Sequence, residues 1–221
     1  MNNSLKCQRL FAFNSVFFKN LFSEYTYPWD ILPELKDLID NIIRVGIGEY
    51  TLFGDRILIG KNVRISPSAY IKGPTIISDN CEIRHGAFIR GSVILGKGCV
   101  VGNSSELKNC ILMDRAQAPH FNYVGDSVLG EGAHLGAGAI CSNLRSDGKN
   151  VLIRTESEAI DTGRRKLGAI LADGAEIGCG AVLCPGTVIG MSTTVYPLIM
   201  TRGVYPANSI VKSTYEVISK A

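Results

Sequence analysis

Residues 57–113 read ILIGKNVRISPSAYIKGPTIISDNCEIRHGAFIRGSVILGKGCVVGNSSELKNCILM and repeat with a period of six. One register holds a large aliphatic residue at every sixth position, namely Ile59, Ile65, Ile71, Ile77, Ile83, Ile89, Leu95, Val101, Leu107 and Met113. A second register of mostly smaller residues lies two positions earlier, namely Ile57, Val63, Ala69, Thr75, Cys81, Ala87, Val93, Cys99, Ser105 and Ile111. Neither an α-helix nor an ordinary strand keeps this period.

The repeat unit is a very short strand followed by a corner. Two inward apolar residues flank one variable residue, and turn-forming groups such as Gly60-Lys61-Asn62 and Ser66-Pro67-Ser68 follow. Repetition at period six predicts a parallel β-helix in which each coil buries its apolar positions against the next. A β-sandwich is excluded, because its strands recur every eight to twelve residues and pair through hairpins.

Upstream of the repeat, residues 1–50 are predicted to form an aromatic segment and a helical cap. Apolar residues from Pro28 to Val45 recur at helical spacing with charged residues on the opposite face, which indicates an amphipathic helix. A cap protects the exposed strand edges at the end of a solenoid. Trp29, the only tryptophan, is expected to be structural rather than a ligand contact.

Downstream, the solenoid is predicted to span residues 51–212. The register slips between Met113 and Val124, around Pro119-His120-Phe121-Asn122-Tyr123, and a five-residue step separates Val124 from Leu129. Such a slip is typical of a corner bulge that re-aims side chains. Residues 144–167 lose the repeat and are predicted to form an inserted hairpin arm, on the face where insertions often bind ligands. Residues 213–221 form a polar tail to which no function is assigned.

Composition limits the classes of function. The chain has 221 residues, 46% of them hydrophobic, and a net charge of only +3, which gives no case for a nucleic-acid surface. Its seven cysteines are odd in number and include no Cys-x-x-Cys, so a reducing, cytoplasmic setting is expected. Neither a clean signal peptide nor a membrane-spanning segment is predicted.

Three histidines are candidates for chemistry. His85 and His134 occupy repeat positions, and His85 is interpreted as a solvated surface residue. His120 lies in the register slip beside Tyr123, and Asn143 follows about one coil later. A corner histidine is at least as often a structural hydrogen-bonding residue, so these residues alone leave both interpretations open.

Ordered polar motifs within the repeat give the chain a family resemblance. They are Gly102-Asn103-Ser104-Ser105-Glu106-Leu107-Lys108, His120-Phe121-Asn122-Tyr123-Val124-Gly125-Asp126, Gly136-Ala137-Gly138, Asn143-Leu144-Arg145-Ser146-Asp147-Gly148-Lys149 and Thr162-Gly163-Arg164-Arg165-Lys166-Leu167-Gly168-Ala169. With the hexapeptide frame, residues 50–212 resemble the acetyltransferase domain of bifunctional N-acetylglucosamine-1-phosphate uridyltransferase/glucosamine-1-phosphate acetyltransferases, in the form found in sugar-1-phosphate nucleotidyltransferases with an acetyltransferase tail.

This resemblance implies a left-handed β-helix, a homotrimer with its active site between subunits, and acetyl-CoA as the donor. His120 matches the family's general base, which takes a proton from the attacking amino group. Arg90, Lys108 and Lys149 match residues that hold the sugar phosphate. Tyr123 and Asn143 match residues that contact the sugar and the reacting groups.

The resemblance also implies the residues that bind the donor. They are Ala137, Cys179, Pro197, Arg164 and Arg165, and a backbone N–H near Ala137 is expected to support the thioester oxyanion. Three positions depart from the family pattern: His134 stands for Asn, Cys179 for Ser and Pro197 for Ala. His134 is either a second titrating group or a substituted hydrogen-bonding residue. No metal site is predicted, and Mg²⁺ is compatible with the sugar phosphate but not required.

The leading hypothesis is therefore an acetyl-CoA-dependent N-acetyltransferase of an amino-sugar 1-phosphate, such as glucosamine-1-phosphate, in UDP-N-acetylglucosamine synthesis. A variant of it takes galactosamine-1-phosphate or a nucleotide-linked amino sugar. The alternative is a non-catalytic hexapeptide module that oligomerises, or senses a sugar nucleotide, for a separate nucleotidyltransferase. Uridylyl transfer is not expected, because about 50 residues before the coils are too few for a nucleotide-binding domain.

Overall fold

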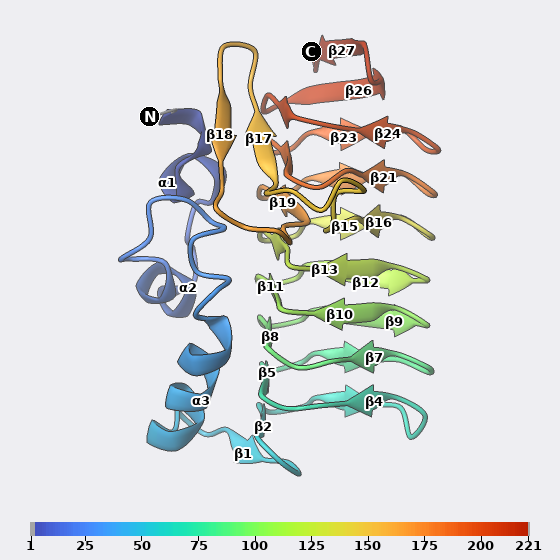
Figure 1. Cartoon of the computed structure of the whole chain (residues 1–221). Coiled ribbons are helices and arrows are strands. Elements are labelled where there is room, and N and C mark those ends of the chain that lie inside the picture. Colours follow the sequence, from blue (N-terminus) through green and yellow to red (C-terminus); the bar gives the residue numbers. More distant parts are fainter. Residues whose placement is uncertain (1–2, 221) are drawn as a thin grey trace.

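The computed structural model describes residues 3–220 and confirms the parallel β-helix (Figure 1). Each coil contributes one short strand to each of three sheets, here called A, B and C in the order in which the chain enters them. The turns between them are called the A–B, B–C and C–A corners. Consecutive strands of one sheet pair in parallel, for example Ile57 with Thr75 in sheet A.

The strands are two to five residues long, as the triplet repeat predicts. Sheet A contains β1 (Thr51–Leu52), β2 (Ile57–Ile59), β5 (Thr75–Ile77), β8 (Val93–Leu95), β11 (Cys110–Leu112), β14 (Val128–Leu129), β19 (Ala169–Leu171), β22 (Thr187–Ile189) and β25 (Val204–Tyr205). Sheet B contains β3 (Arg64–Ile65), β6 (Glu82–Ile83), β9 (Val100–Asn103), β12 (Gln117–His120), β15 (His134–Leu135), β20 (Glu176–Ile177), β23 (Thr194–Val195), β26 (Ser209–Ser213) and β27 (Glu216–Ser219). Sheet C contains β4 (Tyr70–Ile71), β7 (Phe88–Ile89), β10 (Glu106–Lys108), β13 (Tyr123–Gly125), β16 (Ile140–Cys141), β21 (Val182–Leu183) and β24 (Met200–Thr201).

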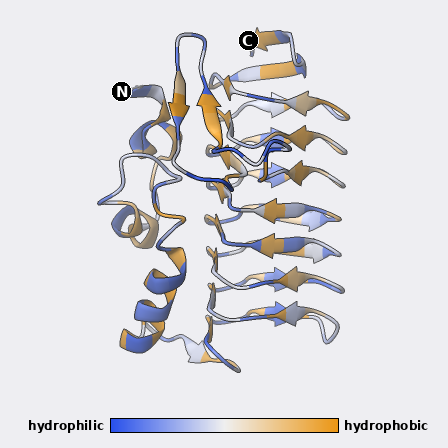
Figure 2. Cartoon of the chain, viewed as in Figure 1, coloured by the Kyte–Doolittle hydropathy of each residue, from blue (hydrophilic) through white to orange (hydrophobic). Residues whose placement is uncertain are grey.

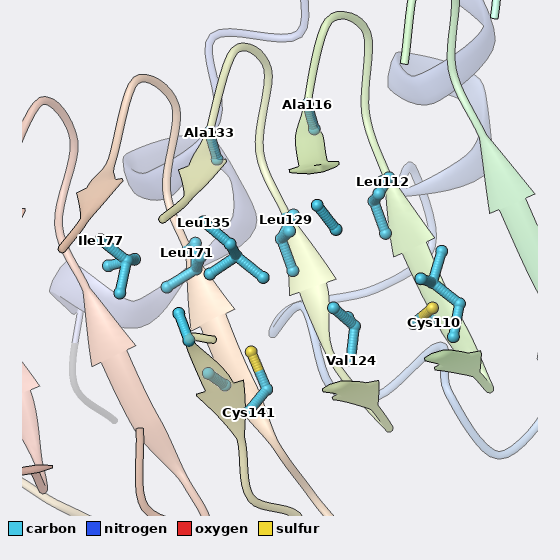
Figure 3. Packing of buried hydrophobic residues seen from close by; sticks show 14 of the residues in the cluster. Cys110, Leu112, Ala116, Val124, Leu129, Ala133, Leu135, Cys141, Leu171 and Ile177 are labelled. Atoms are coloured by element: carbon cyan, nitrogen blue, oxygen red, sulfur yellow. The ribbon is translucent and has the colours of Figure 1, made fainter. Parts of the chain in front are cut away.

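The inward side chains stack from coil to coil into one continuous core (Figure 3). Large aliphatic residues such as Leu112, Leu129 and Leu171 lie above one another, and small residues such as Ala116 and Ala133 fill the corners. Cys110 and Cys141 are free thiols in this core, where burial raises the pKa of Cys141 to about 12. These cysteines therefore act as small hydrophobic residues, as predicted.

The register of the core changes earlier than the sequence pattern predicts. The interior side chains of β11 are Cys110 and Leu112, not Ile111 and Met113. In sheet C, Ile89 pairs with Leu107, 18 residues later, whereas in sheet A Leu95 pairs with Leu112, only 17 residues later. The C–A corner at Lys108–Asn109 is therefore one residue shorter than the C–A corner of the preceding coil. Ile111 fits the six-residue count in the sequence although its side chain points outward, because the outer face of sheet A is also buried and therefore also aliphatic.

The second predicted irregularity is confirmed. The five-residue step between Val124 and Leu129 is another short C–A corner, at Asp126. The corner that carries His120 has ordinary length, because His120 is directly paired with Asn103 of the preceding coil. The predicted bulge at His120 is therefore wrong, and the short corners lie at the opposite edge of sheet C.

The N-terminal segment lies along the outer face of sheet A (Figure 1). It contains η1 (Asn3–Leu5), α1 (Cys7–Leu10), α2 (Val16–Leu21) and α3 (Leu35–Val45). Helix α3 begins after Pro33 rather than at Pro28, because a proline disfavours helical geometry in the residue before it. Trp29 is buried and stacks on Tyr27 with ring centroids 4.6 Å apart, so its role is structural, as expected.

The insertion and the tail both form hairpins. Strands β17 (Leu152–Arg154) and β18 (Ala159–Asp161) make the predicted arm, whose Val151 and Ile153 are buried against the solenoid. The tail, to which the sequence assigned nothing, pairs β27 antiparallel with β26 and so covers the last edge of sheet B. At the other end β1 covers the edge of sheet A in the same way. Within residues 3–220, no helix is both long and apolar enough to cross a membrane.

Candidate active site

The predicted acceptor residues meet around one buried carboxylate. Asp126 is 2% exposed, and its Oδ1 and Oδ2 each lie 3.2 Å from Lys108 Nζ. Asn143 Nδ2 donates to Asp126 Oδ2 at 2.6 Å, and Asn109 Nδ2 donates to Oδ1 at 2.9 Å. Both short C–A corners are thus joined through Asp126. We call Lys108, Asn109, Tyr123, Asp126 and Asn143 the C–A cluster.

Tyr123 connects this cluster to the outer face of sheet C. Its hydroxyl oxygen accepts a hydrogen bond from Asn143 Nδ2 at 3.2 Å. Gly125 makes room for it, because a Cβ at this position would lie 2.5 Å from the tyrosine hydroxyl. Partial burial raises the pKa of Tyr123, so the phenol stays protonated at neutral pH and remains a hydrogen-bond donor.

The other two predicted phosphate residues are less closely joined to the cluster. Arg90 Nη1 donates to Glu106 Oε1 at 2.7 Å, on strand β10 beside Tyr123. Lys149 lies in the loop before the arm, where its backbone N–H donates to Asp147 Oδ1 at 3.2 Å. Among the described residues the Lys149 ammonium has no partner in the C–A cluster, so one chain brings together Lys108, Tyr123 and Asn143 but not Lys149.

His120 lies at the B–C corner, the other edge of sheet C. Its side chain is exposed, and its ring makes no hydrogen bond to any residue within 3–220. Its backbone is held by Asn122, whose Oδ1 accepts the His120 N–H at 3.0 Å. Asn122 is 2% exposed, and its Nδ2 donates to the carbonyls of Gly136 and Ala139 at 2.8 and 3.2 Å. A fixed backbone therefore carries an imidazole that is free to meet a substrate.

Three predicted donor-binding residues continue the same corner, one coil after another. Gly138 N–H donates to the His120 carbonyl at 2.9 Å, and Gly180 N–H donates to the Ala137 carbonyl at 2.8 Å. Leu198 N–H donates to the Cys179 carbonyl at 2.9 Å. His120, Ala137, Cys179 and Pro197 therefore form an exposed row, which we call the B–C ladder.

Close packing of adjacent coils explains why residue 136, directly before Ala137, is a glycine. A Cβ at Gly136 would lie 2.7 Å from the backbone nitrogen of Cys179, so this glycine allows adjacent coils to approach each other. The Ala137 N–H itself has no hydrogen-bond acceptor in the described chain. A free backbone donor thus lies one coil from His120, where the sequence predicted oxyanion support.

Arg164 and Arg165 do not lie on the B–C ladder of the same chain. They line a groove beside the C–A cluster, together with Asp126 and Leu144. Burial lowers the pKa of Arg164, and the negative charges of Asp126 and then Asp30 oppose that effect. Within one chain these arginines therefore accompany the predicted acceptor residues rather than Ala137, Cys179 and Pro197.

The other two histidines are both hydrogen-bonded. His85 Nδ1 lies 2.6 Å from Ser68 Oγ, so this exposed residue has a partner besides solvent. His134 Nδ1 lies 2.9 Å from Glu176 Oε2 on the outer face of sheet B. No contact joins His134 to His120 within the described chain.

Two residues of the site were missed from the sequence. Asp126 and Asn122 both belong to the quoted motif but were assigned no role. Asp126 gave a weak signal, as an acidic residue directly after Gly125 at the five-residue step. Asn122 gave a clearer one, because it occupies an inward corner position that holds Ala87 or Ala139 in other coils.

Comparisons with known proteins identify relatives of the chain. Residues 71–162 match the family model of the GMPPB C-terminal domain. The chain is 33% identical over 174 residues to a bifunctional sugar-1-phosphate nucleotidylyltransferase/acetyltransferase of Sulfurisphaera tokodaii, covering 77% of this chain and 43% of the relative. It is 32% identical over 196 residues to the bifunctional protein GlmU of Methanococcus aeolicus, covering 87% of this chain and 47% of the relative. The chain spans less than half the length of these two relatives.

A solved structure supports the fold alone. The polySia-specific acetyltransferase NeuO matches with a TM-score of 0.52 at 14% identity, over 74% of this chain and 81% of NeuO. The six-residue repeat, the three-sheet coil and the sequence matches agree with one another. The chain is a hexapeptide-repeat β-helix related to the C-terminal domains of GlmU and GMPPB.

Proposed function

We propose that the chain is an acetyl-CoA-dependent N-acetyltransferase of an amino-sugar 1-phosphate, with glucosamine-1-phosphate as the first candidate acceptor. One observation carries this proposal. An exposed imidazole without a protein partner and a free backbone N–H lie on adjacent coils, at His120 and Ala137. A purely structural corner does not need the unpaired imidazole, whereas acyl transfer needs a base and an oxyanion donor. The free N–H recurs at Cys179 of the next coil, so the imidazole is the more specific of the two groups.

In the proposed reaction, a His120 ring nitrogen accepts a proton as the 2-amino group of the sugar attacks the thioester carbonyl carbon. The carbonyl oxygen becomes an oxyanion that accepts a hydrogen bond from the Ala137 N–H. The new C–N bond then remains while the C–S bond breaks, and the departing CoA sulfur takes up the proton held by His120. The products are an N-acetyl sugar and free CoA thiol, so no metal, oxidant or further reactant is required.

The acceptor is proposed to lie across the outer face of sheet C. Tyr123 reaches from this face to Asn143, and both side chains retain hydrogen-bonding capacity for sugar hydroxyls. Arg90, which is paired with Glu106, and Lys108, which is paired with Asp126, are the phosphate contacts that the family resemblance implies, with Lys149 as the third. The donor is proposed to run along the B–C ladder past Cys179 and Pro197, with a neighbouring subunit completing the site.

A thiol-release assay tests this function. Acetyl-CoA would be incubated with glucosamine-1-phosphate, galactosamine-1-phosphate, glucosamine-6-phosphate or glucosamine, and the free CoA thiol measured. Activity restricted to the 1-phosphates is the expected result. A folded protein that acetylates none of the four contradicts the proposal and favours a non-catalytic module.

His120→Ala supplies the matched variant. Acetyl transfer should fall by roughly 10²- to 10⁴-fold, because the base is lost. The far-ultraviolet spectrum and melting temperature should stay unchanged, because the exposed ring makes no hydrogen bond or ion pair within residues 3–220. His85→Ala, at the same corner two coils earlier, is the control and should keep full activity. Turnover that survives in His120→Ala would show that another group is the base.

A further inference from the structure

The base of the arm forms an open groove of about 740 Å³ beside the C–A cluster. It is lined by Asp126, by Leu144, by the segment from Thr162 to Lys166 and by Pro33 of the N-terminal segment. The segment that returns from β18 to the coils is hydrophilic, in contrast to the apolar strands of the arm (Figure 2). Three parts of the chain, distant in sequence, thus enclose one polar groove.

The groove has a positive charge that its own residues do not neutralise. Lys108 and Asp126 form a salt bridge, and Asn109 and Asn143 donate further hydrogen bonds to the same carboxylate. Arg164, Arg165 and Lys166, in contrast, form no salt bridge with any carboxylate of residues 3–220. Asp30 is the other acidic residue that acts on Arg164, and it acts only through space.

Arg164 is held in place by its backbone and by Nε. Its backbone N–H donates to Thr162 Oγ1 at 3.3 Å, its carbonyl accepts from Val151 N–H at 2.7 Å, and Nε donates to the Lys166 carbonyl at 3.3 Å. Neither terminal nitrogen of its guanidinium donates to a described residue. A half-buried, positioned guanidinium with both terminal nitrogens free matches the two oxygens of a phosphate.

We propose that this groove binds the phosphate group of the acceptor and that Arg164 is its direct ligand, with Arg165 and Lys166 adding positive charge. This inference rests on the proposed function for the identity of the acceptor, but not for the chemistry of the ligand. It revises the donor-binding role predicted for Arg164 and Arg165. It also replaces Lys108 as a phosphate contact, because the Lys108 ammonium is already paired with Asp126, so Lys108 instead holds the Asp126 carboxylate in the wall of the groove.

Direct binding tests the proposal without turnover. Titration calorimetry on the full chain would use glucosamine-1-phosphate, inorganic pyrophosphate, CoA and 3′-dephospho-CoA as separate probes. Arg164→Gln should weaken glucosamine-1-phosphate and pyrophosphate by about tenfold or more, as expected for the loss of a charged hydrogen-bonded pair. Arg164→Lys should be intermediate, because lysine keeps the charge but not the planar fork. CoA binding should be unchanged in both.

Arg154→Gln is the control, because Arg154 is an exposed arginine of the same arm that lies outside the groove. It should bind every probe as the wild type does. Equal affinities in wild type and Arg164→Gln would overturn the proposal. If Arg164→Gln weakened only the binding of CoA, and not that of 3′-dephospho-CoA, the groove would bind the 3′-phosphate of the donor and the proposal would be overturned. Pyrophosphate binding that depends on Arg164 supports the groove even if the thiol-release assay is silent, so the two proposals fail separately.

Discussion

Asn122 is the residue that holds the backbone of the proposed base. Its amide accepts the His120 N–H and donates to carbonyls of the next coil, so Asn122→Ala removes these bonds and leaves buried groups without partners. The expected loss of unfolding free energy is about 1–3 kcal/mol. Acetyl transfer should fall further than this stability loss explains, with kcat reduced and the KM for acetyl-CoA nearly unchanged.

A double variant separates positioning from folding. Because Asn122 is argued to act only through His120, His120→Ala combined with Asn122→Ala should be no less active than His120→Ala alone. Ser104→Ala, at an exposed position of the preceding coil's corner, is the control and should change neither stability nor kcat. If the activity losses of the two single variants multiplied in the double variant, Asn122 would act on the fold and not through His120.

At the residue scale, the sequence predicted the polar set better than its arrangement. His120, Lys108, Tyr123 and Asn143 were identified by resemblance. Lys108 and Asn143 do contact one carboxylate, and Tyr123 joins them through Asn143. Asp126 was missed because its role depends on two corners that are adjacent only once the coils stack. A burial pattern shows which positions face inward, but it does not show which buried polar groups will find partners.

Sheet A is the element that is buried on both faces. Within β8, Val93 and Leu95 face the solenoid core and Ile94 faces the N-terminal segment, and all three are fully buried. Ile94→Ala should therefore lower the free energy of unfolding by about 2–5 kcal/mol, as at any core position. The control is Val100→Ala, because Val100 is the corresponding outward residue of the next strand of the same coil and is only partly buried.

Urea unfolding at a fixed protein concentration measures both variants. Val100→Ala should change stability by no more than roughly 1 kcal/mol. A loss at Ile94 no larger than that at Val100 would mean that the N-terminal segment contributes little to the folded state. A loss at Ile94 alone would establish the segment as a second core layer.

At the element scale, the contact between the N-terminal segment and sheet A left a signal in the sequence that the count by six residues concealed. The middle residues of successive sheet A strands, Leu58, Ile76 and Ile94, are all aliphatic at a spacing of 18, whereas Arg64 and Glu82 are the equivalents in sheet B. Comparison at 18 residues would have identified one covered face. The same covered face caused the error at Ile111, since an outward aliphatic residue is indistinguishable from an inward one in a single-register count.

The three outer faces of the whole molecule differ in what covers them. Sheet A carries the N-terminal segment, and sheet B presents polar side chains such as Gln117 and Glu176. Sheet C and the B–C corner instead expose large apolar side chains: Tyr70 is 60% exposed, Phe121 59%, Leu198 84% and Met200 51%. Since His120 lies at this corner, self-association there would enclose the proposed active site, as the predicted trimer requires.

Leu198 offers a test that separates association from folding. It adopts a φ of +61°, a left-handed backbone conformation that is unfavourable for a bulky residue and that asparagine adopts more readily. Leu198→Asn should therefore fold at least as stably in the monomer while losing an exposed apolar contact. Light scattering should report a trimer for the wild type, and a shift toward the 23.9 kDa single chain, with a parallel loss of acetyl transfer, for the variant.

Val45→Asn is the matched control, because Val45 is 76% exposed but lies at the end of α3, in the N-terminal segment that covers sheet A rather than sheet C. Its mass and activity should equal those of the wild type. If Leu198→Asn remained a fully active trimer, the corner would not be part of the interface. If the wild type were an active monomer, the B–C ladder and the face of sheet C would have to supply every catalytic group from one chain, and the trimer implied by the family resemblance would be wrong for this protein.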